Sequence, residues 1–100
     1  MKRYSLPILV LILTTLLLNT VMAQVVGNPD AGREKARACA ACHGMDGKGR
    51  IPLAGKMADD LEKQLRAYQS GSRHEETMNT ITKQLDDQDI ADLAAYFASQ

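Results

Sequence analysis

The most informative segment of the chain is the short run Cys39-Ala40-Ala41-Cys42-His43. Two thiols three residues apart lie on the same side of a helical turn, and the next residue places an imidazole beside them. The chain of 100 residues has two cysteines and two histidines in all, so this single turn holds most of the side chains that bind transition metals strongly. Any metal or cofactor chemistry of the chain is therefore expected at this turn.

This C-x-x-C-H pattern predicts covalent attachment of one haem c, with its iron. Cys39 and Cys42 are spaced to reach the two vinyl groups on one edge of a porphyrin, and His43 then brings a neutral imidazole to the iron. We predict that Cys39 and Cys42 bind the haem and that His43 is the first axial ligand.

Three other interpretations fit the two cysteines less well. A thioredoxin-like redox pair would follow a strand of an α/β fold, and no strand is predicted before Cys39. A structural zinc site normally has four ligands, and outside the motif the sequence offers only His74 as a further Cys or His. A plain disulfide would leave His43 without a role.

Residues 1–23 are predicted to be an export signal. Basic residues stand at positions 2 and 3, residues 6–18 form an uncharged run of thirteen, and residues 21–23 (Val-Met-Ala) place small or slim side chains where a signal peptidase reads. Export implies a periplasmic location.

Cleavage before Gln24 would leave 77 of the 100 residues as one cytochrome-sized domain, residues 24–100. The alternative is an uncleaved membrane anchor, which needs roughly 20 apolar residues, whereas Asn19 and Thr20 interrupt the run sooner. We therefore expect no stable membrane insertion after cleavage and a membrane-anchored protein only if the signal is retained.

Composition supports a bound cofactor and argues against nucleic acid. A domain of 77 residues is marginally stable on its own core, and this segment has one Phe, two Tyr and no Trp to fill one. A large buried haem would supply the missing apolar mass. The segment carries ten basic and twelve acidic residues, interleaved along the predicted helices, so nucleic acid is not an expected partner.

The hydrophobic pattern predicts helices only. Asn28 and Pro29 begin the first, which is expected to run to about Cys42. Gly32 in the middle of this helix predicts that another helix crosses it at close range. Residues 43–57 contain four glycines and a proline, which predicts an extended loop.

Three more helical segments are expected after the loop. One runs from about Ala58 to Gln69 and stops at Ser70-Gly71. A short one lies within residues 75–84, where apolar residues recur at helical spacing. The last follows Asp86, which can cap it.

Taken in order, these features resemble the class I bacterial c-type cytochromes, in particular single-domain relatives of periplasmic dihaem carriers and the haem subunits of flavocytochromes. The resemblance covers nearly all of residues 27–99, and the matching stretches are 30–33 (DAGR), 39–44 (CAACHG), 52–55 (PLAG), 71–73 (GSR) and 89–97 (DIADLAAYF). It implies the all-α class I cytochrome c fold, about four helices around one covalently bound haem, with the first and last helices crossing at right angles beside it. It also implies that the carbonyl of Pro52 accepts a hydrogen bond from His43 and orients its ring.

The resemblance further implies a methionine as second axial ligand, because thioether sulfur favours ferrous iron. Met78 matches the family's position between the Gly-x-Arg element and the last helix. Met45 lies too close to His43 to reach the other face of the ring, and Met57 follows the loop expected on the histidine side. His74 would give bis-histidine ligation, although an isolated histidine among charged residues is more often on the surface.

The expected function is periplasmic one-electron transfer, with no catalytic residues. Partners would be redox proteins: a donor dehydrogenase or cytochrome complex, and an acceptor oxidase or reductase. The alternative is a haem c subunit of a larger dehydrogenase such as a sulfide-oxidising flavocytochrome, which would make the chain the electron-accepting part of an oxidoreductase. A peroxidase or gas sensor would need an open iron position, against which Met78 argues.

Overall fold

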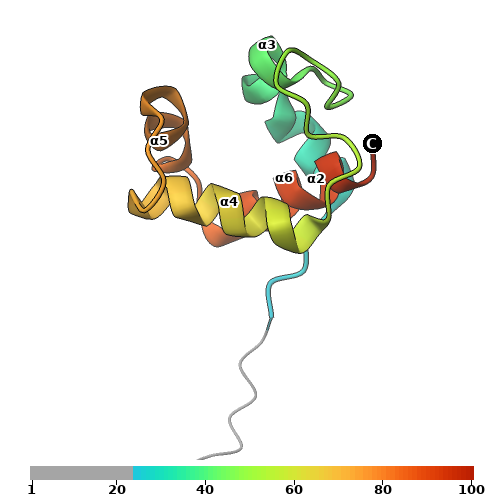
Figure 1. Cartoon of the computed structure of the whole chain (residues 1–100). Helices are drawn as coiled ribbons and strands as arrows, with labels where there is room; N and C mark the ends of the chain where they lie inside the picture. Colours follow the sequence, from blue (N-terminus) through green and yellow to red (C-terminus); the bar gives the residue numbers. More distant parts are fainter. Residues whose placement is uncertain (1–23) are drawn as a thin grey trace, which may run out of the picture.

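The structure, a computed structural model, describes residues 24–100, and its regular elements are all helical (Figure 1). They are α2 (Pro29–Lys35), the 3₁₀ helix η1 (Ala36–Cys39), α3 (Ala40–His43), α4 (Ala58–Ser70), α5 (Glu76–Thr82) and α6 (Asp87–Ala98). The all-α prediction is confirmed. The predicted export signal, residues 1–23, lies outside the described residues. Between residues 24 and 100, no helix has the length and apolar character needed to cross a membrane.

The first predicted helix begins where expected but is not uniform. Asn28 caps it, since its side chain accepts the backbone N–H groups of Asp30 (2.9 Å) and Ala31 (3.3 Å). The expected single helix is instead three consecutive pieces, because η1 separates α2 from α3. A 3₁₀ helix has about 3.0 residues per turn rather than about 3.6. It therefore changes the direction in which the following side chains, those of the cysteine motif, point.

Helices α2 and α6 pack against each other, and they do so at Gly32, as the sequence predicts. A Cβ atom on Gly32 would lie 2.0 Å from the carbonyl oxygen of Asp92 and 2.8 Å from the Cβ of Tyr96. No side chain fits at that distance, so the glycine is needed for the close approach of the two helices. Figure 1 shows α2 and α6 side by side near the C-terminus.

A small polar network fixes this crossing. The buried carboxylate of Asp92 accepts hydrogen bonds from the Asn28 backbone N–H (2.7 Å) and the Lys35 ammonium (2.7 Å). Lys35 also contacts the carboxylate of Asp89 at 2.9 Å, and the Gln88 amide donates to Asp92 at 2.8 Å. The network joins the start of the described chain to its last helix.

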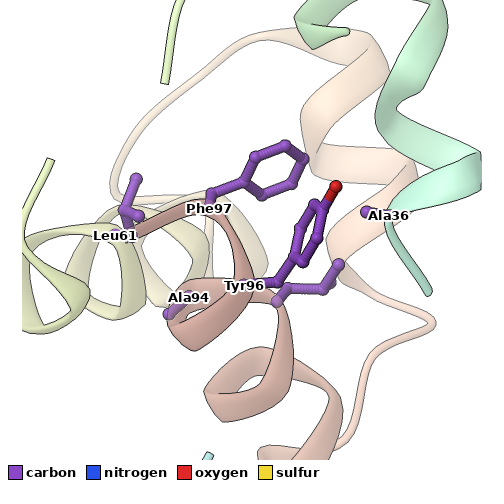
Figure 2. Close-up of a cluster of buried hydrophobic side chains, with 6 residues drawn as sticks. Ala36, Leu61, Ala94, Tyr96 and Phe97 are labelled. Atoms are coloured by element: carbon purple, nitrogen blue, oxygen red, sulfur yellow. The ribbon is translucent and has the colours of Figure 1, made fainter. Parts of the chain in front are cut away.

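The hydrophobic core lies between η1, α4 and α6 (Figure 2). Tyr96 and Phe97 meet edge to face, with ring centroids 5.2 Å apart. The buried cluster consists of Ala36, Leu61, Leu93, Ala94, Tyr96 and Phe97. Half-buried side chains around it include Cys39 and Met45, so the core extends to the cysteine motif and its loop.

The three remaining helices lie where they were predicted: α4 begins at Ala58 and ends one residue after the expected Gln69, α5 falls within residues 75–84, and α6 follows Asp86. Gly71, whose φ of 83° is left-handed, caps the C-terminus of α4, and Asp86 forms a capping box with Asp89 at the start of α6. Between them α5 packs on α4 and begins after Glu75, whose side chain caps it. In Figure 1, α5 and α3 stand apart, and α4 runs below both of them.

Candidate functional site

The three motif residues lie together at the end of the first helical segment. Cys39 is the last residue of η1, and Cys42 and His43 belong to α3. Both cysteines are half-buried free thiols, whereas the His43 side chain is buried, with 9% of the residue exposed. Two accessible thiols beside a sheltered imidazole match what covalent attachment and axial ligation require.

The ring of His43 is oriented by a backbone carbonyl. Its Nδ1 lies 2.8 Å from the carbonyl oxygen of Ile51, a distance at which Nδ1–H donates to the carbonyl. The prediction that Pro52 supplies this carbonyl is therefore wrong by one residue. Because proline restricts the preceding residue to extended backbone, Pro52 still helps to fix the Ile51 carbonyl. The bond leaves Nε2 as the nitrogen that can bind a metal.

The loop after α3 folds back onto the motif. The N–H of Gly49 donates to the His43 carbonyl (2.8 Å), and the N–H of Ile51 donates to the Cys42 carbonyl (3.0 Å). A Cβ on Gly49 would lie only 2.6 Å from the backbone N of Gly44, so this contact admits glycine alone. The Tyr96 hydroxyl, from α6, also donates to the backbone carbonyl of Met45 and ties the loop to the core.

Charge and burial distinguish the two thiols. Burial raises the pKa of the Cys39 thiol, because a low-dielectric surrounding disfavours the thiolate. The Cys42 sulfur instead lies 3.6 Å from a guanidinium nitrogen of the exposed Arg50. Lys48, Lys56 and the acidic Asp46 are also exposed on the loop after α3, and Arg50 is the basic side chain that lies beside Cys42.

The candidates for the second axial ligand lie in different surroundings. Met78 is half-buried in the first turn of α5, where its N–H donates to the Glu75 carboxylate at 2.8 Å. Met57 is 69% exposed just before α4, and Met45 packs against the core near the motif. His74 is exposed in the turn between α4 and α5. These positions alone do not assign the ligand, so Met78 stays a prediction.

The donor set fits a c-type haem. Cys39 and Cys42 offer free thiols from consecutive helical turns, and the Nε2 of His43 is available while Nδ1 is engaged. Imidazole nitrogen is a common haem ligand, and thiols form the thioethers of c-type attachment. Within residues 24–100, no three His, Cys, Asp or Glu side chains are grouped to hold a metal ion.

Two features of the structure have no signal in the sequence. The Ile51 carbonyl carried no signal of its own, although the proline after it marks the loop. The side chains that join α5 to α4, chiefly Gln69 and Asn79, were not predicted either, because polar residues on the surface of a predicted helix are usually solvated.

Comparison with known proteins agrees with this geometry. Residues 30–100 match the family model described as cytochrome c. The chain is 44% identical over 97 residues to cytochrome c4 of Pseudomonas aeruginosa, covering 93% of this chain and 48% of that protein. It is 42% identical over 81 residues to cytochrome c-554(548) of Halomonas halodenitrificans, covering 74% of this chain and 98% of that protein.

Solved structures show the same fold. The crystal structure of reduced recombinant cytochrome c4 from Pseudomonas stutzeri superposes with a TM-score of 0.70 at 38% identity, covering 75% of this chain and 46% of that one. The chain thus spans about half the length of the cytochromes c4 that it matches. Cytochromes of this kind are electron-transfer proteins rather than enzymes, which agrees with the prediction from the sequence. This chain belongs to the cytochrome c family.

Proposed function

We propose that this protein is an exported one-electron carrier that holds a single haem c through Cys39 and Cys42, with His43 and Met78 as axial ligands. The observation that carries the proposal is the hydrogen bond between His43 Nδ1 and the Ile51 carbonyl, which fixes the ring and leaves Nε2 for iron. When bound, the haem supplies an iron that alternates between the ferric and ferrous states. Residues 1–23 would be removed on export, which leaves residues 24–100 as the cytochrome domain.

The chain's own residues account for the other needs of a carrier. His43 is buried and held by the folded-back loop, so its ring need not move when the charge on the iron changes. A thioether ligand from Met78 would close the sixth position and exclude water and peroxide. Two retained ligands keep structural change on electron transfer small.

The surface beside Cys42 is the proposed contact with redox partners. Arg50 is exposed beside Cys42, and Lys48, Lys56 and the 49% exposed Ile51 lie on the same loop. Small, mixed surfaces of this kind suit weak, transient complexes. Donor dehydrogenases or cytochrome complexes and acceptor oxidases or reductases with an acidic contact surface would fit it.

Replacement of Met78 tests the ligand assignment. Met78→Ala should keep the covalent haem, lose the weak far-red sulfur-to-iron band of the oxidised protein and lower the reduction potential, because a ligand that favours ferrous iron is gone. Absorption spectra and a potentiometric titration measure both effects.

Met57→Ala is the matched control for this experiment. Met57 is exposed, and its replacement should leave the far-red band and the potential unchanged. If Met57→Ala loses the band and Met78→Ala keeps it, the assignment of Met78 is wrong. If the wild-type protein already binds cyanide rapidly, its sixth position is open and the carrier proposal fails.

A further inference from the structure

The short helix α5, which carries Met78, is fastened to α4 near its start by one side chain. The Asn79 amide nitrogen donates to the backbone carbonyls of Tyr68 (2.8 Å) and Arg73 (2.9 Å). Its carbonyl oxygen accepts the Glu75 N–H at 2.9 Å. A side-chain amide has two N–H groups and one oxygen, and all of them are engaged here. Asn79 thus joins the end of α4, the connecting turn and the start of α5.

A second amide fastens the other end of α5. The Gln69 side chain, from α4, donates to the backbone carbonyls of Thr82 (3.0 Å) and Leu85 (2.8 Å). Thr82 is the last residue of α5 and Leu85 lies in the turn that follows, where its N–H also donates to the Thr82 carbonyl (3.1 Å), so Gln69 ties the end of α5 and this turn to α4. Thr82 is fully buried, and its hydroxyl donates to the Met78 carbonyl at 2.7 Å.

Met78 lies between these two attachments. Helix α5 has seven residues, too few to be stable alone in water, so its position depends on contacts with the rest of the chain. At Met78 the backbone is held on both sides, since its N–H donates to the Glu75 carboxylate and its carbonyl accepts from Thr82. None of these bonds involves the thioether, which remains free to bind iron.

We infer that Asn79 and Gln69 are positioning residues for the methionine ligand: they hold α5 against α4 and so limit the movements by which Met78 would leave the iron. This inference rests on the proposed role of Met78. It predicts that loss of either amide makes it easier for an external ligand to replace the methionine, and that an equally destabilising substitution elsewhere in the protein does not.

The test compares Asn79→Leu and Gln69→Leu with Gln88→Leu in the full-length, exported, haem-loaded protein. Gln88 is a matched control because its amide also donates two hydrogen bonds, to the Val26 carbonyl (2.9 Å) and to Asp92 (2.8 Å), at the α2 and α6 crossing. The readouts are the rate of cyanide binding to the ferric protein, the intensity of the far-red band, and amide hydrogen exchange in residues 76–82.

The Asn79 and Gln69 variants should bind cyanide about tenfold faster, the factor that one or two neutral hydrogen bonds carry. They should also show a weaker far-red band and faster exchange in α5. Gln88→Leu should keep the wild-type cyanide rate and band although it loses two side-chain hydrogen bonds, as many as Gln69→Leu loses. If a leucine variant does not accumulate, Asn79→Ser and Gln69→Ala replace it.

The outcomes separate this inference from the proposed function. The inference is overturned if the Asn79 and Gln69 variants keep the wild-type cyanide rate and band while Met78→Ala changes both. It is also overturned if Gln88→Leu accelerates cyanide binding equally, since a general loss of stability would then explain the effect. If Met78→Ala itself keeps the band, the ligand assignment fails, and this inference fails with it.

Discussion

The ring of His43 is oriented by a hydrogen bond to the protein backbone. Its Nδ1–H donates to the carbonyl of Ile51. The backbone N–H of Ile51 in turn donates to the carbonyl of Cys42, which belongs to the motif. The loop and the motif therefore position each other, and the axial nitrogen needs no further side chain to orient it.

Gly32 gives a prediction at the scale of one residue. Gly32→Ala would place a methyl group 2.0 Å from the Asp92 carbonyl oxygen, which is backbone and cannot move aside cheaply. The helices must separate, and we expect a loss of about 1–3 kcal/mol in the free energy of unfolding. Urea denaturation of the haem-loaded protein, followed by far-ultraviolet circular dichroism, measures this loss.

Arg33→Ala is the control, because Arg33 is the next residue of α2 and is exposed. It should change the free energy of unfolding by no more than about 0.5 kcal/mol. Equal stability of Gly32→Ala and the wild type would show that α2 and α6 do not approach as closely as described.

The helices show what the sequence could and could not reveal. Asn28 and Asp86 are caps with a strong local signal, and both begin a helix as predicted. The 3₁₀ turn before the motif was missed, since its residues Ala36–Cys39 have no propensity that distinguishes it from α-helix. Gln69 and Asn79 were missed because their bonds depend on how α4 and α5 pack, which local pattern does not encode.

The network between α2 and α6 predicts how stability depends on pH. The hydrogen bond from Lys35 lowers the pKa of Asp89. Burial acts to raise the pKa of Asp92, but hydrogen bonds from Lys35, the Asn28 N–H and Gln88 outweigh it and hold that pKa below its usual value. A carboxyl whose pKa is lowered on folding stabilises the protein above its unfolded pKa of about 3.9, and this stabilisation is lost as the pH falls through the folded value.

Asp92→Asn tests this assignment. At pH 7 it should cost about 2–3 kcal/mol, since a buried carboxylate with charged and neutral donors is lost. The wild type should lose stability below about pH 4, and the variant should lose less over the same range. Urea midpoints at pH 7 and pH 3 measure the difference in stability between the wild type and Asp92→Asn, and this difference should be smaller at pH 3. Parallel losses in both proteins would mean that Asp92 does not carry the effect.

At the scale of the whole molecule, the helix that carries the predicted histidine ligand, α3, and the helix that carries the predicted methionine ligand, α5, lie apart. The cysteine motif spans the end of η1 and α3, its loop follows α3, the predicted methionine lies on α5, and α4 runs below α3 and α5 in the view of Figure 1. The buried hydrophobic cluster is small and centres on Tyr96 and Phe97. In a domain of this size, a haem attached to Cys39 and Cys42 would add apolar mass that the side chains do not provide.

The most direct test of this account is acid–acetone extraction of the full-length protein, exported in a host with periplasmic haem-attachment machinery, followed by the mass of the intact chain. Covalent attachment predicts that the haem absorbance stays with the protein and that the mass equals residues 24–100 plus one haem. Cys39→Ala combined with Cys42→Ala should yield protein without bound haem. If the haem of the wild type passes into the acetone, or if the exported chain carries none, Cys39 and Cys42 do not hold a haem and the proposed function is wrong.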